Sequence, residues 1–249
     1  MPGQRIRLDA HLVAVGLVRS REEAQRRVLA GEVRIGERVA AKASETVETD
    51  ASIRIEPRRA SFVSRGGEKL EGALEAFRLE VSGLQALDVG ASTGGFTDCL
   101  LRRGASRVYA VDVGYGQLAW SLRQDPRVVV IERQNVRDLA PEAVPGAIDL
   151  VTIDVSFISL RLVLPKVVSL MRPAGAIIAL VKPQFEVGKG RVGKGGVVRD
   201  PRLHAEVLET IRAAAVDLGL EERGFVESPL LGPKGNREFF LYWTTPGIN

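Results

Sequence analysis

The chain has 249 residues, of which 45% are hydrophobic and 27% charged, a composition typical of a globular protein. Its single cysteine excludes an internal disulfide framework and indicates a reducing, cytoplasmic setting, and one cysteine with two histidines excludes a structural zinc cluster, so we expect no metal. A net charge of +4 and a pI near 9.4 favour an anionic polymer as partner, whereas the polar N-terminus and the short apolar stretch 174–181 predict no membrane insertion.

Residues 1–57 predict a small α+β domain. Apolar residues at helical spacing indicate a helix over 7–16, and the capping box Ser20-Arg21-Glu22-Glu23 begins a second helix that ends near Gly31. Short alternating stretches predict strands at 32–35, 38–41 and 52–56. So small a unit buries little core, and residues 1–60 carry 12 Lys and Arg against 9 Asp and Glu. We therefore expect a docking module, joined by a linker at 58–67 to a second domain at 68–249.

The second domain alternates helices with apolar strands. After a helix that starts at 68, strands are predicted at 84–89, 108–113, 128–132, 148–155 and 176–182. Helices are predicted between them, at 94–103, 116–123, 159–171 and 201–218. Continuous apolar runs are typical of buried parallel strands, so we expect a Rossmann-like sheet with helices on both faces. The last strands, 225–230 and 238–244, have no helix between them and predict an antiparallel hairpin at the sheet edge.

A glycine turn after the first of these strands predicts a ligand pocket. Glycines at such a turn let a ligand approach the backbone and the free amides of the next helix, although a turn kept for tight packing alone is the alternative. The spacing is neither that of dinucleotide enzymes nor that of a phosphate-binding loop. Asp112, at the end of the next strand, suits two ribose hydroxyls, and Asn135 with Asp138 suits an adenine amine. These features together favour S-adenosylmethionine as the cofactor, with a predicted site at Asp88, Gly90, Ser92, Gly94, Phe96, Asp112, Asn135 and Asp138.

Four charged residues lie at the ends of elements. Asp154 and Lys182 end neighbouring predicted strands, Glu238 opens the last strand, and Lys69 begins the first helix of the domain. Ligands of open α/β sheets bind outside the carboxyl ends of the strands, so we expect Asp154 and Lys182 to face the cofactor crevice. A simple ion pair between them is the alternative.

The segment 188–195 satisfies G-x-x-x-x-G-K, but Gly195 occupies the place of the magnesium-binding hydroxyl. It also leads into further loop rather than a helix. We interpret it as a cationic loop that tracks phosphates through Lys189 and Arg191, with an ordinary solvated loop as the alternative.

These motifs resemble the hemolysin A (TlyA) family of rRNA 2′-O-methyltransferases and, more distantly, FtsJ-type methyltransferases. Residues 7–56 resemble the small RNA-binding module of a ribosomal protein, and 64–70 resemble the family's entry to its catalytic domain. The resemblance implies a class I methyltransferase fold and a catalytic tetrad of Lys69, Asp154, Lys182 and Glu238. It also implies ribosomal RNA or ribosomal subunits as partners, without an obligate protein partner. The predicted RNA-binding residues are Arg5, Arg7, Arg21, Arg27, Arg65, Lys189 and Arg191.

Three other functions remain as alternatives at this point. The substrate could be tRNA or another RNA, the protein could be a non-catalytic ribosome-assembly factor, or it could be membrane-lytic as the family's historical name suggests. The complete tetrad argues against the second, and the absence of a spanning segment in the sequence argues against the third. Lys182 could act either as a neutral base or as a cation that steers the hydroxyl.

Overall fold

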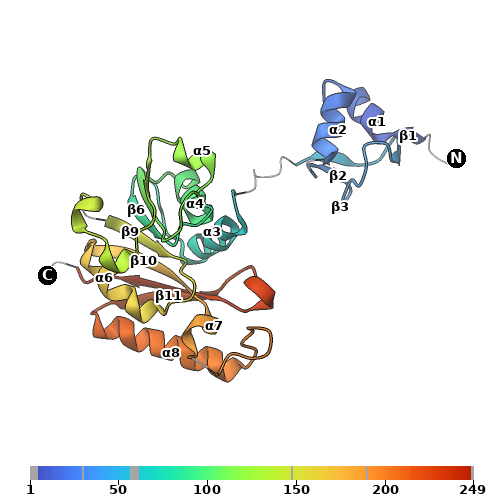
Figure 1. Cartoon of the computed structure of the whole chain (residues 1–249). Helices are drawn as coiled ribbons and strands as arrows, with labels where there is room; N and C mark the ends of the chain where they lie inside the picture. The colour runs from blue at the N-terminus through green and yellow to red at the C-terminus, as the bar shows by residue number, and fades with distance from the viewer. Residues whose placement is uncertain (1–4, 30, 57–61, 147, 189, 248–249) are drawn as a thin grey trace. The chain divides into compact units, whose positions relative to one another are not determined.

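The computed structural model describes residues 5–29, 31–56, 62–146, 148–188 and 190–247 (Figure 1). The chain divides into two compact units, Met1–Ser61 and Phe62–Asn249. Each unit has a hydrophobic core of its own. In the described part of the chain, no helix combines the length and the apolar character needed to cross a bilayer.

The smaller unit packs two helices on short strands. The helices are α1 (Leu8–Ala14) and α2 (Arg21–Leu29). The strands are β1 (Arg5–Arg7), β2 (Val33–Ile35), β3 (Arg38–Val39), β4 (Thr46–Glu48) and β5 (Ile53–Ile55). Strand β1 pairs with β4, and β2 lies between β3 and β5, all antiparallel. At the capping box, Ser20 Oγ accepts the Glu23 amide at 3.1 Å, but the Glu23 carboxylate reaches the Arg19 amide instead of the Ser20 amide.

The larger unit is built on a seven-stranded sheet with the order β11-β12-β10-β9-β6-β7-β8. Its strands are β6 (Gln85–Val89), β7 (Arg107–Val111), β8 (Val128–Ile131), β9 (Ile148–Ile153), β10 (Met171–Val181), β11 (Glu221–Glu227) and β12 (Phe239–Thr244). The five strands from β6 to β10 are parallel, and β12 runs antiparallel to both β10 and β11. The chain moves outward from β6 to β8 and returns to the other side of β6 with β9. A crevice for ligands is expected at this reversal.

Helices cover both faces of this sheet (Figure 1). The α-helices are α3 (Arg65–Phe77), α4 (Gly95–Arg102), α5 (Trp120–Arg123), α6 (Leu164–Ser169), α7 (Pro183–Glu186) and α8 (Pro201–Asp217). The 3₁₀ turns are η1 (Val136–Asp138), η2 (Pro141–Ala143), η3 (Leu160–Leu162) and η4 (Pro233–Gly235). Successive strand residues point to opposite faces, so Ala86 packs with α3 and α4 on one face while Leu87 packs with α6 and α8 on the other.

The predicted fold class is confirmed, including the parallel sheet and its antiparallel edge. Several details differ from the sequence-based expectation. Strands β1 and β4 were not predicted, and only residues 120–123 of the expected helix 116–123 are helical. Residues 65–67, expected in the linker, form the first turn of α3, because Ser64 Oγ accepts the Gly66 amide and starts the helix there. Residues 57–61 of that linker region lie outside the described residues.

Candidate active site

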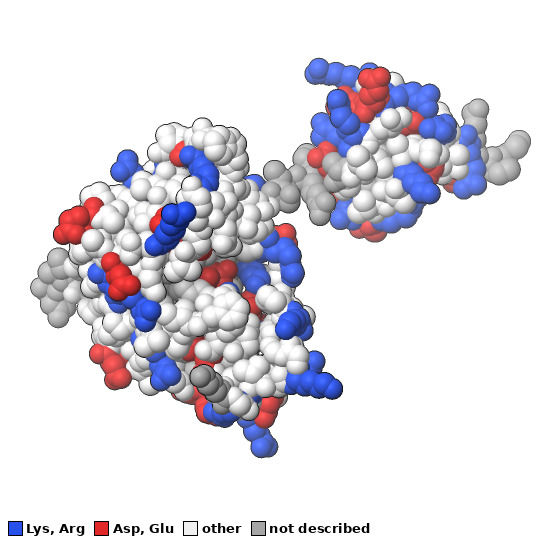
Figure 2. Space-filling model, viewed as in Figure 1, with Lys and Arg blue, Asp and Glu red and all other residues white. Residues whose placement is uncertain are grey.

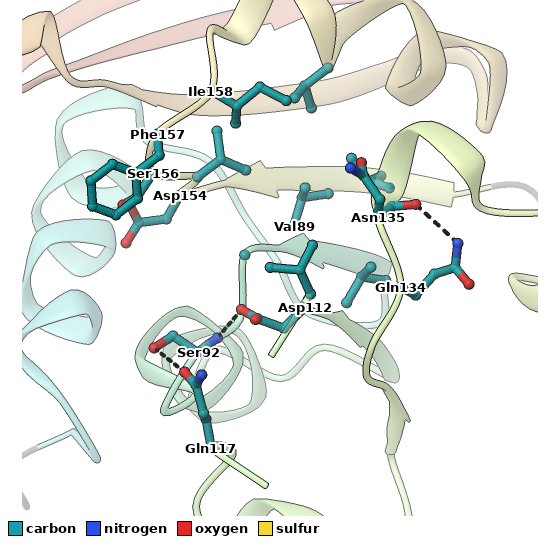
Figure 3. A pocket seen from close by; sticks show the side chains of 16 residues that line it. Val89, Ser92, Asp112, Gln117, Gln134, Asn135, Asp154, Ser156, Phe157 and Ile158 are labelled. Carbon is teal, nitrogen blue, oxygen red and sulfur yellow. Dashed lines mark hydrogen bonds between the residues drawn. The ribbon is translucent and has the colours of Figure 1, made fainter. Parts of the chain in front are cut away.

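A pocket of about 520 Å³ opens at the carboxyl ends of β6, β7, β8 and β9 (Figure 3). Four of the predicted cofactor residues line it, namely Gly90, Ser92, Asp112 and Asn135, together with Asp154 of the predicted tetrad. The remaining lining residues are Val89, Val111, Val113, Gln117, Gln134, Val136, Val155, Ser156, Phe157, Ile158 and Val163. The pocket therefore lies at the strand-order reversal, where the topology places a ligand site.

Asp112 holds two loops of the pocket in place. Its Oδ2 accepts the amide of Ser92 at 2.8 Å (Figure 3). Its Oδ1 accepts the amide of Gly114 at 2.7 Å. A carboxylate has about four lone-pair sites, so each oxygen can accept a further hydrogen bond. Ser92 adopts a left-handed backbone conformation, with φ 49°. The bond from its amide to Asp112 fixes this uncommon geometry at the glycine turn.

Gly90 brings the ends of β6 and β9 together. Its φ is 85°, and a Cβ atom there would lie 2.5 Å from the carbonyl oxygen of Asp154. The Asp154 amide in turn donates to the carbonyl oxygen of Val89 at 2.9 Å. Glycine is required here by both conformation and space. The glycine turn thus borders the cofactor pocket and the charged strand end at once.

Asp88, Gly94 and Phe96, three of the four predicted cofactor residues outside the pocket lining, pack toward the interior of the domain. Asp88 is fully buried and accepts the hydroxyls of Thr97 at 2.7 Å and Thr152 at 3.2 Å. A side chain at Gly94 would collide with Leu122, which a Cβ would approach to 2.3 Å. Phe96 is 3% exposed and packs in the core, so it does not cover a ligand in this structure.

Burial changes the pKa of the Asp88 carboxyl. Desolvation raises the pKa of this carboxyl to about 7, the two threonine hydroxyls oppose the rise, and the nearby charge of Asp154 adds to it. Asp88 is thus a neutral or partly neutral acid beneath the pocket near pH 7.

Around Asn135, the structure separates the two residues expected to bind an adenine amine. Asn135 lines the pocket and its Oδ1 accepts the Arg137 amide at 3.1 Å, which starts η1. Asp138, at the end of that turn, is not among the lining residues. Gln134 and Val136 line the pocket instead, and no motif in the sequence marked either of them.

The four tetrad residues form two ion pairs. Lys182 Nζ lies 2.6 Å from Asp154 Oδ1, and Lys69 Nζ lies 2.6 Å from Glu238 Oε2. Val181 is opposite Phe239 in the β10–β12 ladder, so Lys182 and Glu238 each lie one residue beyond the last pair at the same edge. The sheet therefore places the two pairs side by side, and the predicted alternative of an ion pair between Asp154 and Lys182 describes their contact correctly.

Lys182 has further contacts on the pocket side. Its Nζ donates to Ser156 Oγ at 3.0 Å and lies 6.0 Å from the centre of the Phe185 ring. Ser156 and Asp154 both line the pocket. The ammonium group is thus held by two oxygen atoms at the pocket rim.

The comparisons with known proteins agree with this geometry. A model of the FtsJ-like methyltransferases matches residues 62–245, and a model of the S4 domain matches residues 6–53. The chain belongs to the FtsJ-like methyltransferase family. Its cofactor is S-adenosylmethionine, as the sequence predicted.

The relatives of this methyltransferase include the 16S/23S rRNA (cytidine-2′-O)-methyltransferase TlyA of Mycobacterium tuberculosis, 54% identical over 97% of this chain and 91% of that protein. Hemolysin A of Brachyspira hyodysenteriae is 41% identical over 96% of this chain and 99% of that protein. Among solved structures, a proposed hemolysin from Streptococcus thermophilus matches with a TM-score of 0.73 and 42% identity, over 98% of this chain and 91% of that one. The resemblance to the hemolysin A (TlyA) family is confirmed.

Prediction from the sequence did not identify the loop that closes one side of the methyltransferase pocket. Phe157 lines the pocket, is 91% exposed, adopts a φ of 63° and contacts Phe185 with ring centres 4.8 Å apart. Glu186 holds this loop by accepting the Ser159 hydroxyl at 2.6 Å and the Leu160 amide at 2.8 Å. Burial raises the pKa of the Glu186 carboxyl. The only signal in the sequence was the closeness of Phe185 and Glu186 to Lys182.

The predicted RNA-binding residues differ in how they are held. Arg7 and Arg21 both contact Asp9, whereas Arg5 lies exposed in β1. The others are Arg27, paired with Glu23 and Glu32; Arg65, which donates to the Leu231 carbonyl at 3.0 Å; and Arg191, paired with Glu206. Lys189 lies outside the described residues. Within the described ranges, no group of three or more His, Cys, Asp or Glu residues converges as a metal site.

Proposed function

We propose that this methyltransferase transfers a methyl group from S-adenosylmethionine to a ribose 2′-hydroxyl of ribosomal RNA. The observation that carries the proposal is the Lys182–Asp154 pair at the rim of the cofactor pocket, with the Lys69–Glu238 pair beside it. One relative is named an rRNA (cytidine-2′-O)-methyltransferase and another, from Bacillus subtilis, an rRNA methyltransferase. The S4-type unit is a known kind of RNA-binding module. The protein would then act in the cytoplasm, on ribosomal RNA or ribosomal subunits.

The pocket residues fit the cofactor. Asp112 keeps acceptor capacity for ribose hydroxyls, and Asn135 and Gln134 provide polar edges for an adenine ring. When bound, S-adenosylmethionine supplies an electrophilic methyl group. We assign the nucleoside end to Asp112 and Asn135, and the reacting end to the side of the pocket lined by Asp154 and Ser156.

Lys182 is the proposed central residue of catalysis. Its ammonium group is held by the ion pair with Asp154 and the hydrogen bond to Ser156, so its position is set before any substrate arrives. The Asp154 carboxylate lies 2.6 Å from its Nζ, the distance of a close ion pair. This contact favours Lys182 as a cation that orients the 2′-hydroxyl, with the proton leaving late. Correct alignment of a bound pair is worth up to roughly 7–11 kcal/mol in favourable cases.

The smaller unit is proposed to hold the RNA while the larger unit carries out the transfer. The residues proposed to contact RNA are Arg5, Arg7, Arg21, Arg27, Arg65, Lys189 and Arg191. A chain beginning at Phe62 should bind S-adenosylmethionine like the full chain, because the larger unit has its own core. It should methylate RNA poorly and bind it with a shallower salt dependence, since fewer phosphate contacts remain. Equal RNA affinity and equal salt slope in the two chains would remove this role from the smaller unit.

The reaction itself is tested with labelled S-adenosylmethionine and purified ribosomal subunits, followed by mass-spectrometric mapping of ribose methylation. We expect a new 2′-O-methyl group on rRNA with the wild-type protein and none with Lys182→Ala. Base methylation, or transfer to tRNA with rRNA left unmodified, would contradict the proposal.

A further inference from the structure

A buried carboxylate in the smaller unit lies between two of the predicted RNA-binding arginines. Asp9, in the first turn of α1, is 0% exposed. Its Oδ1 accepts Arg7 Nε at 3.1 Å and its Oδ2 accepts Arg7 Nη2 at 2.8 Å. Arg21 Nη2 also donates to Oδ2, at 2.9 Å. Two guanidinium groups from β1 and α2 thus meet at one carboxylate oxygen.

The backbone around Asp9 fixes this carboxylate. The Asp9 amide donates to the Ala43 carbonyl at 2.9 Å, and the Ala10 amide donates to Asp9 Oδ1 at 2.8 Å. The two arginines hold the pKa of the Asp9 carboxyl well below its usual range, with the Arg7 hydrogen bond as the largest cause. Asp9 is therefore an ionised and well-fixed anchor under ordinary conditions.

A gain in folding stability does not explain why Asp9 is buried between two arginines. Burying a carboxylate is costly, and a buried ion pair rarely stabilises a fold more than apolar residues of similar volume. Bringing two guanidinium groups to one oxygen adds repulsion between them. The cluster keeps a net positive charge because two cations share one anion.

The outer parts of both arginines remain accessible. The side chains of Arg7 and Arg21 are 49% and 55% exposed, although Asp9 beneath them is fully covered. A guanidinium has five N–H donors in a rigid fork. Arg7 uses two of them on Asp9 and Arg21 uses one. Two adjacent forks with free donors match the oxygens of a phosphate group. Basic side chains are also abundant on the visible surface of this unit (Figure 2).

We propose that Asp9 is a positioning residue that holds Arg7 and Arg21 as a preformed phosphate-binding pair for the RNA backbone. The proposal rests on the proposed RNA-binding function of the smaller unit, and adds to it which phosphate site is preformed and what fixes it. Preorganisation lowers the entropy lost when long side chains are immobilised on binding. Glu56 of this unit is also contacted by two arginines, Arg34 and Arg54, but its side chain is 49% exposed, whereas Asp9 is fully covered. The Arg38–Glu45 contact brings a single arginine to a carboxylate and offers a matched comparison.

The test is the affinity of the full chain for a fluorescently labelled RNA hairpin, measured by anisotropy over a range of salt concentrations. Asp9→Asn removes a negative charge next to the proposed site, so simple electrostatics predicts tighter binding. We expect the opposite, a roughly fivefold to tenfold weaker affinity and a salt slope shallower by about 1, because the fixed phosphate contact is lost. The control Glu45→Gln removes one negative charge from a half-buried carboxylate of the same unit, and should leave binding unchanged or tighter.

Two further measurements separate positioning from folding. If Asp9 acts through the arginines, Asp9→Asn should add nothing to the loss in a variant that already carries Arg7→Ala and Arg21→Ala. If circular dichroism shows that Asp9→Asn unfolds the smaller unit, the pair Arg7→Lys and Arg21→Lys replaces it. That pair keeps both charges and removes the forks, and it should weaken binding by a similar factor.

The outcomes distinguish this proposal from the proposed function. Wild-type protein that fails to bind the hairpin and ribosomal subunits alike would contradict RNA binding itself. Wild-type binding with equal or tighter binding by Asp9→Asn, or equal binding by the double lysine variant, would overturn only the role of Asp9.

Discussion

The two lysine–carboxylate pairs lie one strand apart at the same edge of the sheet, yet their surroundings differ. In the Lys182–Asp154 pair the carboxylate is 23% exposed and lines the cofactor pocket. In the Lys69–Glu238 pair the carboxylate is 0% exposed and is not among the pocket-lining residues. A Cβ at Gly232 would come within 1.9 Å of Glu238 Oε1, so even the loop before β12 is shaped around this side chain.

This difference in exposure suggests that one ion pair contributes to the reaction and the other to the structure of the site. An ion pair that borders a pocket can exchange one of its partners for a reactant, whereas a fully enclosed pair keeps its partners and fixes the elements that carry them. Lys69 belongs to α3 and Glu238 precedes β12, so their contact joins two segments 169 positions apart in the chain. We therefore expect the first pair to act mainly in methyl transfer and the second mainly in holding the edge of the sheet.

The largest effect is expected at Lys182. Lys182→Ala should fold, bind S-adenosylmethionine and bind RNA near normally, yet lose about 10³-fold or more in the transfer rate, within the range of acid–base and positioning effects. Lys182→Arg keeps the charge but cannot act as a base, because arginine stays protonated. Single-turnover transfer to ribosomal subunits is the measurement.

Substantial activity in Lys182→Arg would support steering by a cation, and loss in both variants would leave a base or a strict requirement for shape. A methyl-transfer rate near that of the wild type in Lys182→Ala would contradict the proposed mechanism.

The second prediction concerns stability. Glu238→Ala leaves Lys69 unpaired at a site where its side chain is only 10% exposed, so the free energy of unfolding should fall by about 3 kcal/mol. Asp154→Ala should cost less, about 1 kcal/mol, because the Asp154 carboxylate is 23% exposed at the pocket and Lys182 keeps its hydrogen bond to Ser156. Urea unfolding of the full chain measures both. Glu238→Gln is the control, since its amide oxygen can still accept from Lys69. An equal decrease in the free energy of unfolding for the two alanine variants would contradict the proposed difference between the two ion pairs.

Cofactor affinity should depend on neither pair but on the opposite wall of the pocket. Asp112→Ala should weaken binding of S-adenosylmethionine by roughly 1.5–3 kcal/mol, the scale of hydrogen bonds to a charged group. Isothermal titration calorimetry with Lys182→Ala as the matched variant checks this, and that variant should bind like the wild type. A larger loss of affinity in Lys182→Ala than in Asp112→Ala would show that the reacting residues also hold the cofactor.

The smallest expected effect is a change in the pKa of Asp88 when the charge of Asp154 is removed. The charge of Asp154 contributes to the raised pKa of Asp88, about 7, so Asp154→Asn should lower that pKa slightly while Glu238→Gln should not. Folded Asp88 keeps a proton that the unfolded chain releases near pH 4. Its contribution to stability is thus complete below pH 4 and decreases as the pH rises to 7. Carboxyl carbon NMR titration, with Asp88→Asn as the assignment control, measures the shift. An unchanged titration of Asp88 in Asp154→Asn would contradict the link.

Much of the larger fold could be predicted because its strands are continuous apolar runs between clear turns. The strands of the smaller unit were harder to predict. Strands β1 and β4 are three residues each, and their pairing of Arg5 with Glu48 joins segments whose polar residues give no strand signal. The expected helix at 116–123 shortened to α5 because the region before it is a loop around Gly114, whose amide binds Asp112.

In the candidate site, the sequence correctly placed Asp112, Asp154 and Lys182 directly after strands, and their roles stay predictions. Position at a strand end fixes where a side chain begins, but it does not fix where that side chain points. Asp88 and Phe96 both follow the expected pattern, and packing turns both into the interior. The loop with Ser156 and Phe157 could not be found from the sequence, because its place depends on contacts with Phe185 and Glu186 that only the folded chain creates.

The close approach at Gly90 limits how this enzyme could be adapted to larger methyl-donor analogues. A single added carbon there would press on the Asp154 carbonyl at 2.5 Å, and so would displace the proposed catalytic pair without touching a reactant. Libraries aimed at bulkier transferable groups should therefore leave position 90 unchanged. Two other pocket residues offer more freedom, because Val113 is 69% and Phe157 is 91% exposed. Trimming these two side chains would widen the entrance while the strand ends that hold Lys182 and Asp154 stay in register.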